Sequence, residues 1–175
     1  MQDADSNQHF RKLLMATCLS STGRSRLELP EQKIVFSYAS ILDSKKKNWR
    51  IAAEIPLYGE ELVELDWNQA MKIKANGLRS QLDKSVQAQL AGLQKFLKLF
   101  GNMESWNCKR TQEQLNCRNE QEKITLDLQS DGYEINLPGW KISATQLNSQ
   151  NFFEKIVLQG QNDSTSWHFF VSSCQ

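Results

Sequence analysis

The four cysteines are the residues of this 175-residue chain whose type and spacing most directly indicate chemistry. Cys108 and Cys117 flank a polar stretch and would face each other if a turn at 112–113 closes a hairpin, so a disulfide between them is geometrically reasonable. Cys18 and Cys174 could form a second bridge that joins an N-terminal helix to the last strand. Four cysteines allow three connectivities, and the spacing does not choose among them.

Two other uses of these cysteines stay open. A zinc site is disfavoured because the chain has no Cys-x-x-Cys pair and because His9 and His168 are distant in the sequence. Four free thiols would instead indicate a cytosolic protein. Disulfides indicate an oxidising compartment, and we therefore expect an export signal to precede this sequence.

Candidate catalytic groups are few. His168 lies between two aromatic residues on an expected strand, where a solvent-facing or space-filling role is the simpler interpretation. The carboxylates within 60–64 surround an expected turn and are typical of a solvated surface. No Gly-x-Ser-x-Gly motif and no phosphate-binding loop occurs. We therefore predict no catalytic residue, no enzymatic activity, no cofactor and no metal.

Charge and hydropathy disfavour two classes of partner. There are 21 lysines and arginines against 20 aspartates and glutamates, which gives a formal net charge of +1. The dense lysine run 45–47 falls between two strand-like segments and is interpreted as a solvated hairpin loop. Nucleic-acid binding is therefore not expected. No apolar run approaches the roughly 18 residues of a membrane-spanning helix, so no transmembrane segment is predicted.

Two helices and a long series of strands must position these residues. Phe10, Leu13 and Leu14 repeat at helical spacing, which predicts an amphipathic N-terminal helix. A second apolar stripe has intervals of three and four residues and predicts a long amphipathic helix over 80–100. From residue 33 onward, most other apolar residues alternate with polar ones, which indicates antiparallel strands.

These elements predict a fold of the α+β class. About nine or ten antiparallel strands usually curl, so we expect a strongly curved sheet, an incomplete β-barrel, covered by the long helix. A sandwich is the competing architecture. No linker, repeat or low-complexity tract interrupts the chain, so residues 1–175 are expected to form one domain. Its parts are an N-terminal helix and linker (1–24), front strands (33–78), a lid helix (80–100) and back strands (104–174).

An incomplete barrel would have an apolar inner wall. Ordinary core packing is the alternative role for each wall residue. If the interior is hollow, each buried methylene of a hydrocarbon ligand would contribute about 0.8 kcal/mol without a polar anchor. The residues expected on this wall share one face of their strands: Trp49, Ile51, Ile55, Leu65, Trp67, Ile73, Ile135, Trp140 and Ile142.

The strand rhythm and aromatic positions of 131–143, 154–158 and 167–171 resemble the closing strands of bacterial lipoprotein-localisation proteins (LolA/LolB-like). The segment from Trp49 to Trp67, followed by a helix, is similar to that family in its order. The resemblance implies a half-barrel with a helical lid, whose apolar cavity holds the acyl chains of a lipoprotein. It also implies a periplasmic or outer-membrane-anchored location.

The sequence therefore predicts a non-catalytic protein of the bacterial cell envelope. The expected partner is a lipid or a lipoprotein acyl chain bound in the apolar cavity. The alternative is an envelope protein-interaction module with a filled core and no small-molecule ligand. Such a module would recognise a partner protein through a strand edge or an exposed sheet face.

Overall fold

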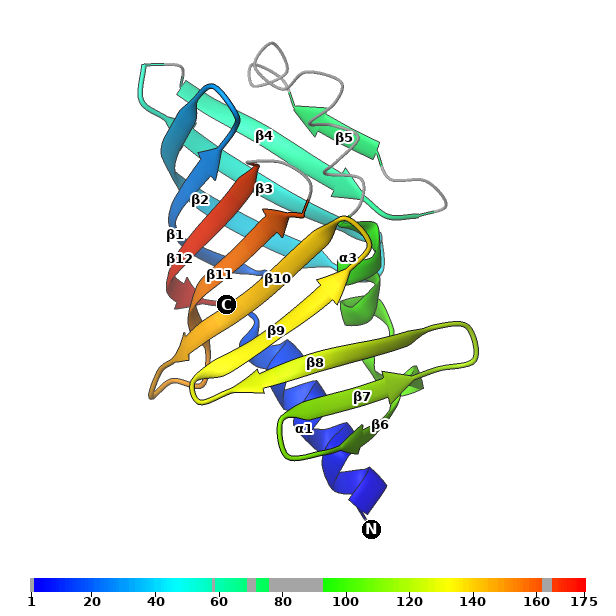
Figure 1. Ribbon diagram of the computed structural model, residues 1–175. Helices are drawn as coiled ribbons and strands as arrows, with labels where there is room; N and C mark the ends of the chain where they lie inside the picture. The colour runs from blue at the N-terminus through cyan, green and yellow to red at the C-terminus, as the bar shows by residue number, and fades with distance from the viewer. Residues whose placement is uncertain (1, 58, 69–71, 76–92, 162–164) are drawn as a thin grey trace.

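A single antiparallel sheet dominates the fold in the computed structural model, which describes residues 2–57, 59–68, 72–75, 93–161 and 165–175 (Figure 1). Twelve strands lie in the described part of the chain, in the order β5-β4-β3-β2-β1-β12-β11-β10-β9-β8-β7-β6. The front strands are β1 (Ser21–Glu28), β2 (Lys33–Asp43), β3 (Asn48–Ile55), β4 (Gly59–Asp66) and β5 (Lys72–Ala75). The back strands are β6 (Asn107–Arg110), β7 (Gln114–Arg118), β8 (Lys123–Gln129), β9 (Gly132–Leu137), β10 (Trp140–Leu147), β11 (Phe153–Gly160) and β12 (Ser166–Cys174).

The first and last strands meet at the centre of the sheet. β1 pairs with β12 along its whole length, with Arg26 opposite His168. On each side of this pair, strands that follow one another in the sequence are also neighbours in the sheet. The strands at the two edges are β5 and β6, which do not pair with each other. The sheet is therefore open.

Alternation of side chains gives the sheet an inner apolar face and an outer polar face. In β2, Ile34, Phe36 and Tyr38 are buried, whereas Lys33 and Ser37 between and beside them are exposed. Successive side chains of a strand point to opposite faces, so one face of β2 contributes to the core and the other contacts solvent.

The sheet curves enough to bring distant strands together on its inner face. β3 and β12 are separated by β2 and β1, which is about 14 Å at the usual strand spacing. The ring of Trp49 on β3 nevertheless lies 5.4 Å from that of Phe169 on β12, centroid to centroid. Figure 1 shows the accompanying twist, because β3 and β4 run at a steep angle to β10–β12.

Helix α1 (Gln2–Ala16) protects the β6 edge of the sheet. The backbone N–H of Cys108 donates to Asn7 Oδ1 at 2.6 Å, and that of Arg110 donates to Ser6 Oγ at 3.2 Å. Unpaired N–H groups on an edge strand otherwise invite pairing with another chain. Phe10 on the same helix is fully buried, so α1 both caps the edge and contributes to the core.

The predicted fold class is wrong in two respects. The sheet has twelve described strands instead of nine or ten, and it is an open sheet instead of an incomplete barrel covered by a long helix. The described residues contain two short α-helices, α1 and α3 (Gln94–Gly101), and a 3₁₀ helix, η2 (Met103–Ser105). Part of the expected helix over 80–100 falls on residues 76–92, which lie outside the described residues.

Strand β1 accounts for part of the error, because some of its buried positions carry polar residues and the apolar alternation is therefore incomplete. The predicted linker within 1–24 includes the first residues of β1, and Ser21 and Ser25 occupy buried positions where an apolar residue is usual. Both hydroxyls are hydrogen-bonded: Ser21 Oγ lies 2.9 Å from the Tyr38 hydroxyl, and Ser25 Oγ accepts from Trp167 Nε1 at 2.7 Å. A buried polar group is tolerated when it has such partners, and these lie far away in the sequence or on another strand.

Candidate functional site

The inner apolar face of the sheet is the principal candidate site. Eight of the nine predicted wall residues are at most 6% exposed and belong to one continuous hydrophobic core. The ninth, Ile73, lies on β5, and its side chain is outside the described part of the structure. The eight are Trp49, Ile51, Ile55, Leu65, Trp67, Ile135, Trp140 and Ile142.

The structure divides these residues into two groups. Trp49 lies opposite Leu65 in the pairing of β3 with β4, and Ile135 lies opposite Ile142 in the pairing of β9 with β10. Between the two groups the sheet contains β2, β1, β12 and β11. Side chains from these central strands must therefore connect the two parts of the wall.

Aromatic rings that the sequence analysis left out of the wall make this connection. Trp167 and Phe169 on β12 pack 5.0 Å apart, and Phe169 also lies 5.1 Å from Tyr38 on β2, measured between ring centroids. Trp49 contacts both β12 rings and donates its indole N–H to the backbone carbonyl of Leu19 at 2.8 Å. The alternation of Trp167, His168 and Phe169 was a usable signal for their inward position.

Tyr133 is a buried titratable group on this face. Its hydroxyl lies 2.6 Å from Thr17 Oγ1, and Thr17 Oγ1 also donates to the carbonyl of Leu13 at 2.8 Å. Burial raises the pKa of the Tyr133 hydroxyl well above its usual range, although the Thr17 hydrogen bond acts in the opposite direction. The phenol stays protonated at neutral pH and ties β9 to the end of α1.

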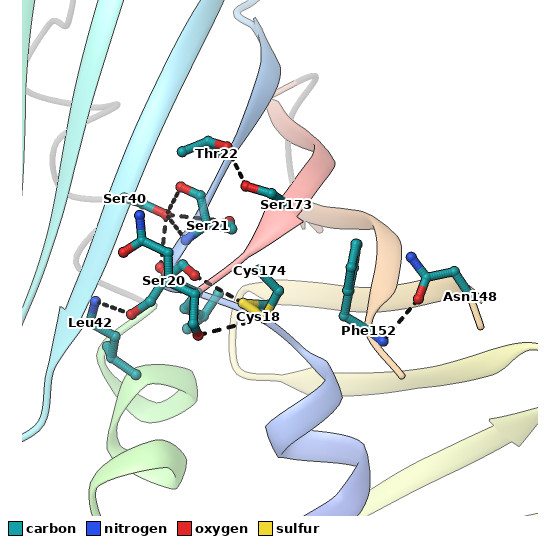
Figure 2. Close-up of a disulfide and its surroundings, with 12 residues drawn as sticks. Cys18, Ser20, Ser21, Thr22, Ser40, Leu42, Asn148, Phe152, Ser173 and Cys174 are labelled. Carbon is teal, nitrogen blue, oxygen red and sulfur yellow. Dashed lines mark hydrogen bonds between the residues drawn. A yellow bond between two sulfur atoms is a disulfide. The ribbon is translucent and has the colours of Figure 1, made fainter. Parts of the chain in front are cut away.

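Two disulfides are present, and their pairing is now defined. Cys18 bonds to Cys174 with a Cα–Cα distance of 5.8 Å, and Cys108 bonds to Cys117 with a Cα–Cα distance of 4.0 Å. Figure 2 shows the first bridge beside Ser20, Ser21 and Ser40, where the chain enters β1. The prediction of disulfides is confirmed. Two such bridges are compatible with an extracytoplasmic protein.

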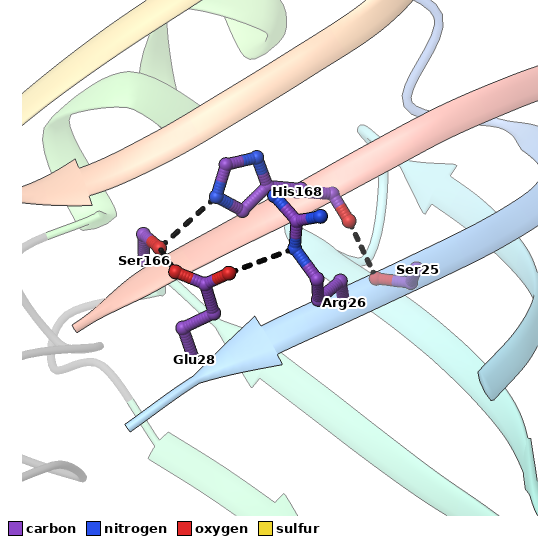
Figure 3. A network of polar contacts seen from close by, with 5 residues as sticks. All are labelled: Ser25, Arg26, Glu28, Ser166 and His168. Carbon is purple, nitrogen blue, oxygen red and sulfur yellow. Dashed lines mark hydrogen bonds and ion pairs between the residues drawn. The ribbon is translucent and has the colours of Figure 1, made fainter. Parts of the chain in front are cut away.

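A polar cluster on the outer face contains a serine, a histidine and a glutamate (Figure 3). Ser166 Oγ lies 3.0 Å from His168 Nε2 and 3.3 Å from Glu28 Oε2. A carboxylate can only accept, so the Ser166 hydroxyl donates to Glu28.

This cluster is not arranged as a nucleophilic triad. In a triad, one ring nitrogen of the histidine accepts the serine proton. The other ring nitrogen donates a hydrogen bond to the carboxylate of the acid. Here Nδ1 of His168 is buried without a hydrogen-bond partner among the described residues, and Glu28 Oε1 lies 2.9 Å from Arg26 Nε. Glu28 therefore contacts Arg26 and Ser166 instead of orienting the His168 ring.

Both histidines should make stability depend on pH. Burial, and then nearby basic groups, lower the pKa of His168 and that of His9 below 6.5. The unfolded chain therefore takes up protons before the folded one, and stability present above pH 6.5 is lost as the pH falls toward the folded-state pKa values. We expect H9Q/H168Q to lose less stability than the parent protein between pH 7.5 and 5.0, measured by urea denaturation. Parallel curves for the two proteins would contradict this expectation.

Leu57 is an exposed apolar residue in a strained conformation. It lies in the turn between β3 and β4, has a φ of 73°, and is fully exposed to solvent. A β-carbon makes positive φ unfavourable, and such outliers concentrate at functional positions. The turn therefore presents an aliphatic side chain outward.

Other site classes were sought in the described residues. These residues contain no group of three or more His, Cys, Asp or Glu side chains that could hold a metal ion. They also contain no helix that is both long enough and apolar enough to cross a membrane. Comparison with known proteins finds no family model and no curated protein that matches this chain.

Proposed function

We propose that this protein is a non-enzymatic protein of the bacterial cell envelope that holds an acyl chain of a lipid or lipoprotein against the inner face of its open sheet. The observation that carries the proposal is the composition of this face. Apolar side chains from both halves of the sheet converge there with the rings of Trp49, Trp167 and Phe169. Such a surface binds hydrocarbon through burial alone.

The open edges supply a way for a ligand to enter. Because β5 and β6 do not pair, these two edges of the sheet can move apart without breaking a ladder of backbone hydrogen bonds, while the pairing of β1 with β12 keeps the halves joined. Admission of an alkyl chain would then require rearrangement of side chains. Rotation of side chains costs far less than the loss of several backbone hydrogen bonds.

Three further features fit this function. The two disulfides suit the periplasm or the outer surface of a membrane. The exposed Leu57 suits a protein that collects its ligand from an apolar phase. The resemblance of the strand rhythm to lipoprotein-localisation proteins suggests a lipoprotein acyl chain as the specific ligand.

A second candidate is an envelope protein-interaction module with a filled core. The observation that favours it is the burial of the wall residues, which reach at most 6% exposure in this structure. In that case the rings of Trp49, Trp167 and Phe169, which pack against one another on the inner face, would occupy the volume that an alkyl chain requires.

Native mass spectrometry of protein purified from a bacterial envelope tests the proposal. We expect an adduct with the mass of an acyl-containing molecule, which organic solvent extracts and a fluorescent fatty acid displaces. Protein of the bare polypeptide mass that also fails to bind the fluorescent fatty acid would refute acyl-chain binding and favour the interaction module.

Ala53 offers a substitution that separates the two candidates. It is fully buried on the inner face of β3, whereas its neighbour Ala52 points to the outer face. If the face accommodates an alkyl chain, the ring of A53F takes that volume, and we expect at least a tenfold loss of fatty-acid affinity with the fold retained. A52F is the matched control and should bind as the parent does.

The filled-core candidate predicts a different result. Overpacking of a well-filled core typically costs about 1–3 kcal/mol. A53F would then lose this much stability in urea denaturation, and the parent protein would bind no fatty acid. That combination would contradict the acyl-chain proposal.

A further inference from the structure

The outer face of the sheet carries a basic pocket at the centre, away from the inner apolar face. The pocket has a volume of about 340 Å³ and is formed by side chains of β1, β2 and β12. We call it the Phe170 pocket. Its principal lining residues are Arg24, Arg26, Lys33, Val35 and Phe170.

Positive charge is concentrated around this pocket. Three basic side chains line it, no carboxylate does, and Lys155 lies beside it with Nζ 5.9 Å from the centroid of the Phe170 ring. Glu28 is the nearby acid, and it is already paired with Arg26. Among the described residues, no carboxylate lies within 4 Å of Arg24, Lys33 or Lys155. These three cations are therefore available to an anion, although the whole chain has a net charge of only +1.

Apolar groups form the middle of the same surface. Phe170 is 37% exposed and Val35 is 41% exposed, because both occupy solvent-facing positions of their strands. The guanidinium of Arg26 lies 5.8 Å from the Phe170 ring centroid, and the His168 ring lies nearly parallel to the Phe170 ring with their centroids 6.3 Å apart. An aromatic ring surrounded by cations at the surface presents an apolar body and an anion-binding rim together.

We propose that the Phe170 pocket binds the headgroup phosphate of an anionic phospholipid at a bilayer surface. Arg24 and Lys33 contact the phosphate, while Phe170 and Val35 contact the boundary between headgroups and acyl chains. This pattern of aromatic and basic side chains is the one that favours membrane interfaces. An acidic protein segment would match the charges but would leave the exposed ring and valine without an apolar partner. The proposal does not depend on a ligand at the inner face.

Vesicle co-sedimentation tests this proposal with the full chain. We expect binding to phosphatidylcholine vesicles that contain 25% phosphatidylglycerol, weak binding to pure phosphatidylcholine, and a decline as salt rises from about 50 to 300 mM because screening weakens the attraction. Each basic residue near an anionic surface contributes about fivefold to the affinity. R24Q/K33Q should therefore bind about 25-fold more weakly than the parent protein.

A second pair of lysines provides the matched control. K45Q/K46Q removes the same charge from the exposed turn between β2 and β3 and should bind within about twofold of the parent. F170A should weaken binding without changing its dependence on salt. Circular dichroism and urea denaturation establish that each variant is folded.

Three results would overturn the proposal. Equal losses in R24Q/K33Q and K45Q/K46Q would indicate attraction by net charge instead of a site. Equal binding to both kinds of vesicle would exclude recognition of the anionic headgroup. Preferential binding of polyglutamate over phosphatidylglycerol vesicles would assign the pocket to an acidic protein partner. Fatty-acid displacement should be unchanged in R24Q/K33Q, so failure here is distinguishable from failure of the proposed function.

Discussion

Removal of the Cys18–Cys174 bridge by C18A/C174A is expected to lower the free energy of unfolding by about 5 kcal/mol in the chain-entropy model. The two cysteines are separated by 156 positions in the sequence, so their bond restricts nearly the whole unfolded chain. The cost of closing a loop grows with its length. Because small domains are typically stable by about 5–15 kcal/mol, this loss would place the protein near its unfolding threshold at 25 °C.

The second disulfide provides an internal control. Cys108 and Cys117 are separated by only nine positions and already lie opposite each other in the pairing of β6 with β7. C108A/C117A should therefore lose about half as much stability, roughly 2.5 kcal/mol. Urea denaturation followed by circular dichroism would measure both losses. Equal losses for the two double variants would contradict an origin in loop length.

The position of the long-range bridge adds a structural expectation. Cys18 follows the end of α1, and Cys174 ends β12. The bridge therefore holds the beginning of the chain against the last strand, beside the pairing of β1 with β12. In hydrogen exchange of C18A/C174A, we expect the amides of β1 and β12 to lose protection more than those of the local hairpin formed by β6 and β7. Protection lost evenly over the sheet would argue against a local role for this bridge.

Substitution of Trp49 is expected to have the second large effect. Its side chain is almost completely buried, contacts Trp167 and Phe169, and donates a hydrogen bond to the carbonyl of Leu19. Large-to-small substitutions of buried aromatic residues typically cost about 3–5 kcal/mol. W49A should therefore lose about this much stability in urea denaturation, because it removes the packing of β3 against β12 and one of the two hydrogen bonds that the Leu19 carbonyl accepts, the other coming from Ser40 Oγ.

A conservative variant separates the two contributions. W49F keeps an aromatic ring but lacks the indole donor. Because the Leu19 carbonyl still accepts from Ser40 Oγ at 2.8 Å, the loss should be that of one ordinary hydrogen bond, about 0.5–1.5 kcal/mol. I41A on the exposed outer face of β2 should change stability by less than about 0.5 kcal/mol. If W49F is as stable as the parent protein, the hydrogen bond to Leu19 does not contribute to folding.

The candidate site was only partly predictable. The period-two alternation of β3, β4, β9 and β10 predicts that the wall residues share one face, because successive side chains of a strand point to opposite faces of the sheet. The rings of Tyr38, Trp167 and Phe169 also lie on this face, and the predicted wall does not include them. Which rings meet depends on sheet curvature, and curvature is not encoded in the spacing of any one strand.

The Phe170 pocket and the edge cap illustrate the same limit. Arg24 and Phe170 face each other across the pairing of β1 with β12 although 146 positions apart in the sequence. The hydrogen bonds from the β6 backbone to Ser6 and Asn7 likewise join distant parts of the chain. Neither arrangement leaves a periodic signal, because the partners lie in separate segments and nothing within either segment indicates the pairing.

The sequence by itself determined the local features: the amphipathic N-terminal segment, the alternating strands from residue 33 onward, and the hairpin that brings Cys108 to Cys117. All of these arise from interactions between residues close in the chain, where helical or strand periodicity is a direct consequence of backbone geometry. Tertiary structure alone decided that the polar segment at 21–28 is a central strand, that the sheet has twelve described strands, and that Cys18 joins Cys174. These three features depend on which segments, distant in the sequence, pack against one another. The free energy of the whole packed core determines that packing.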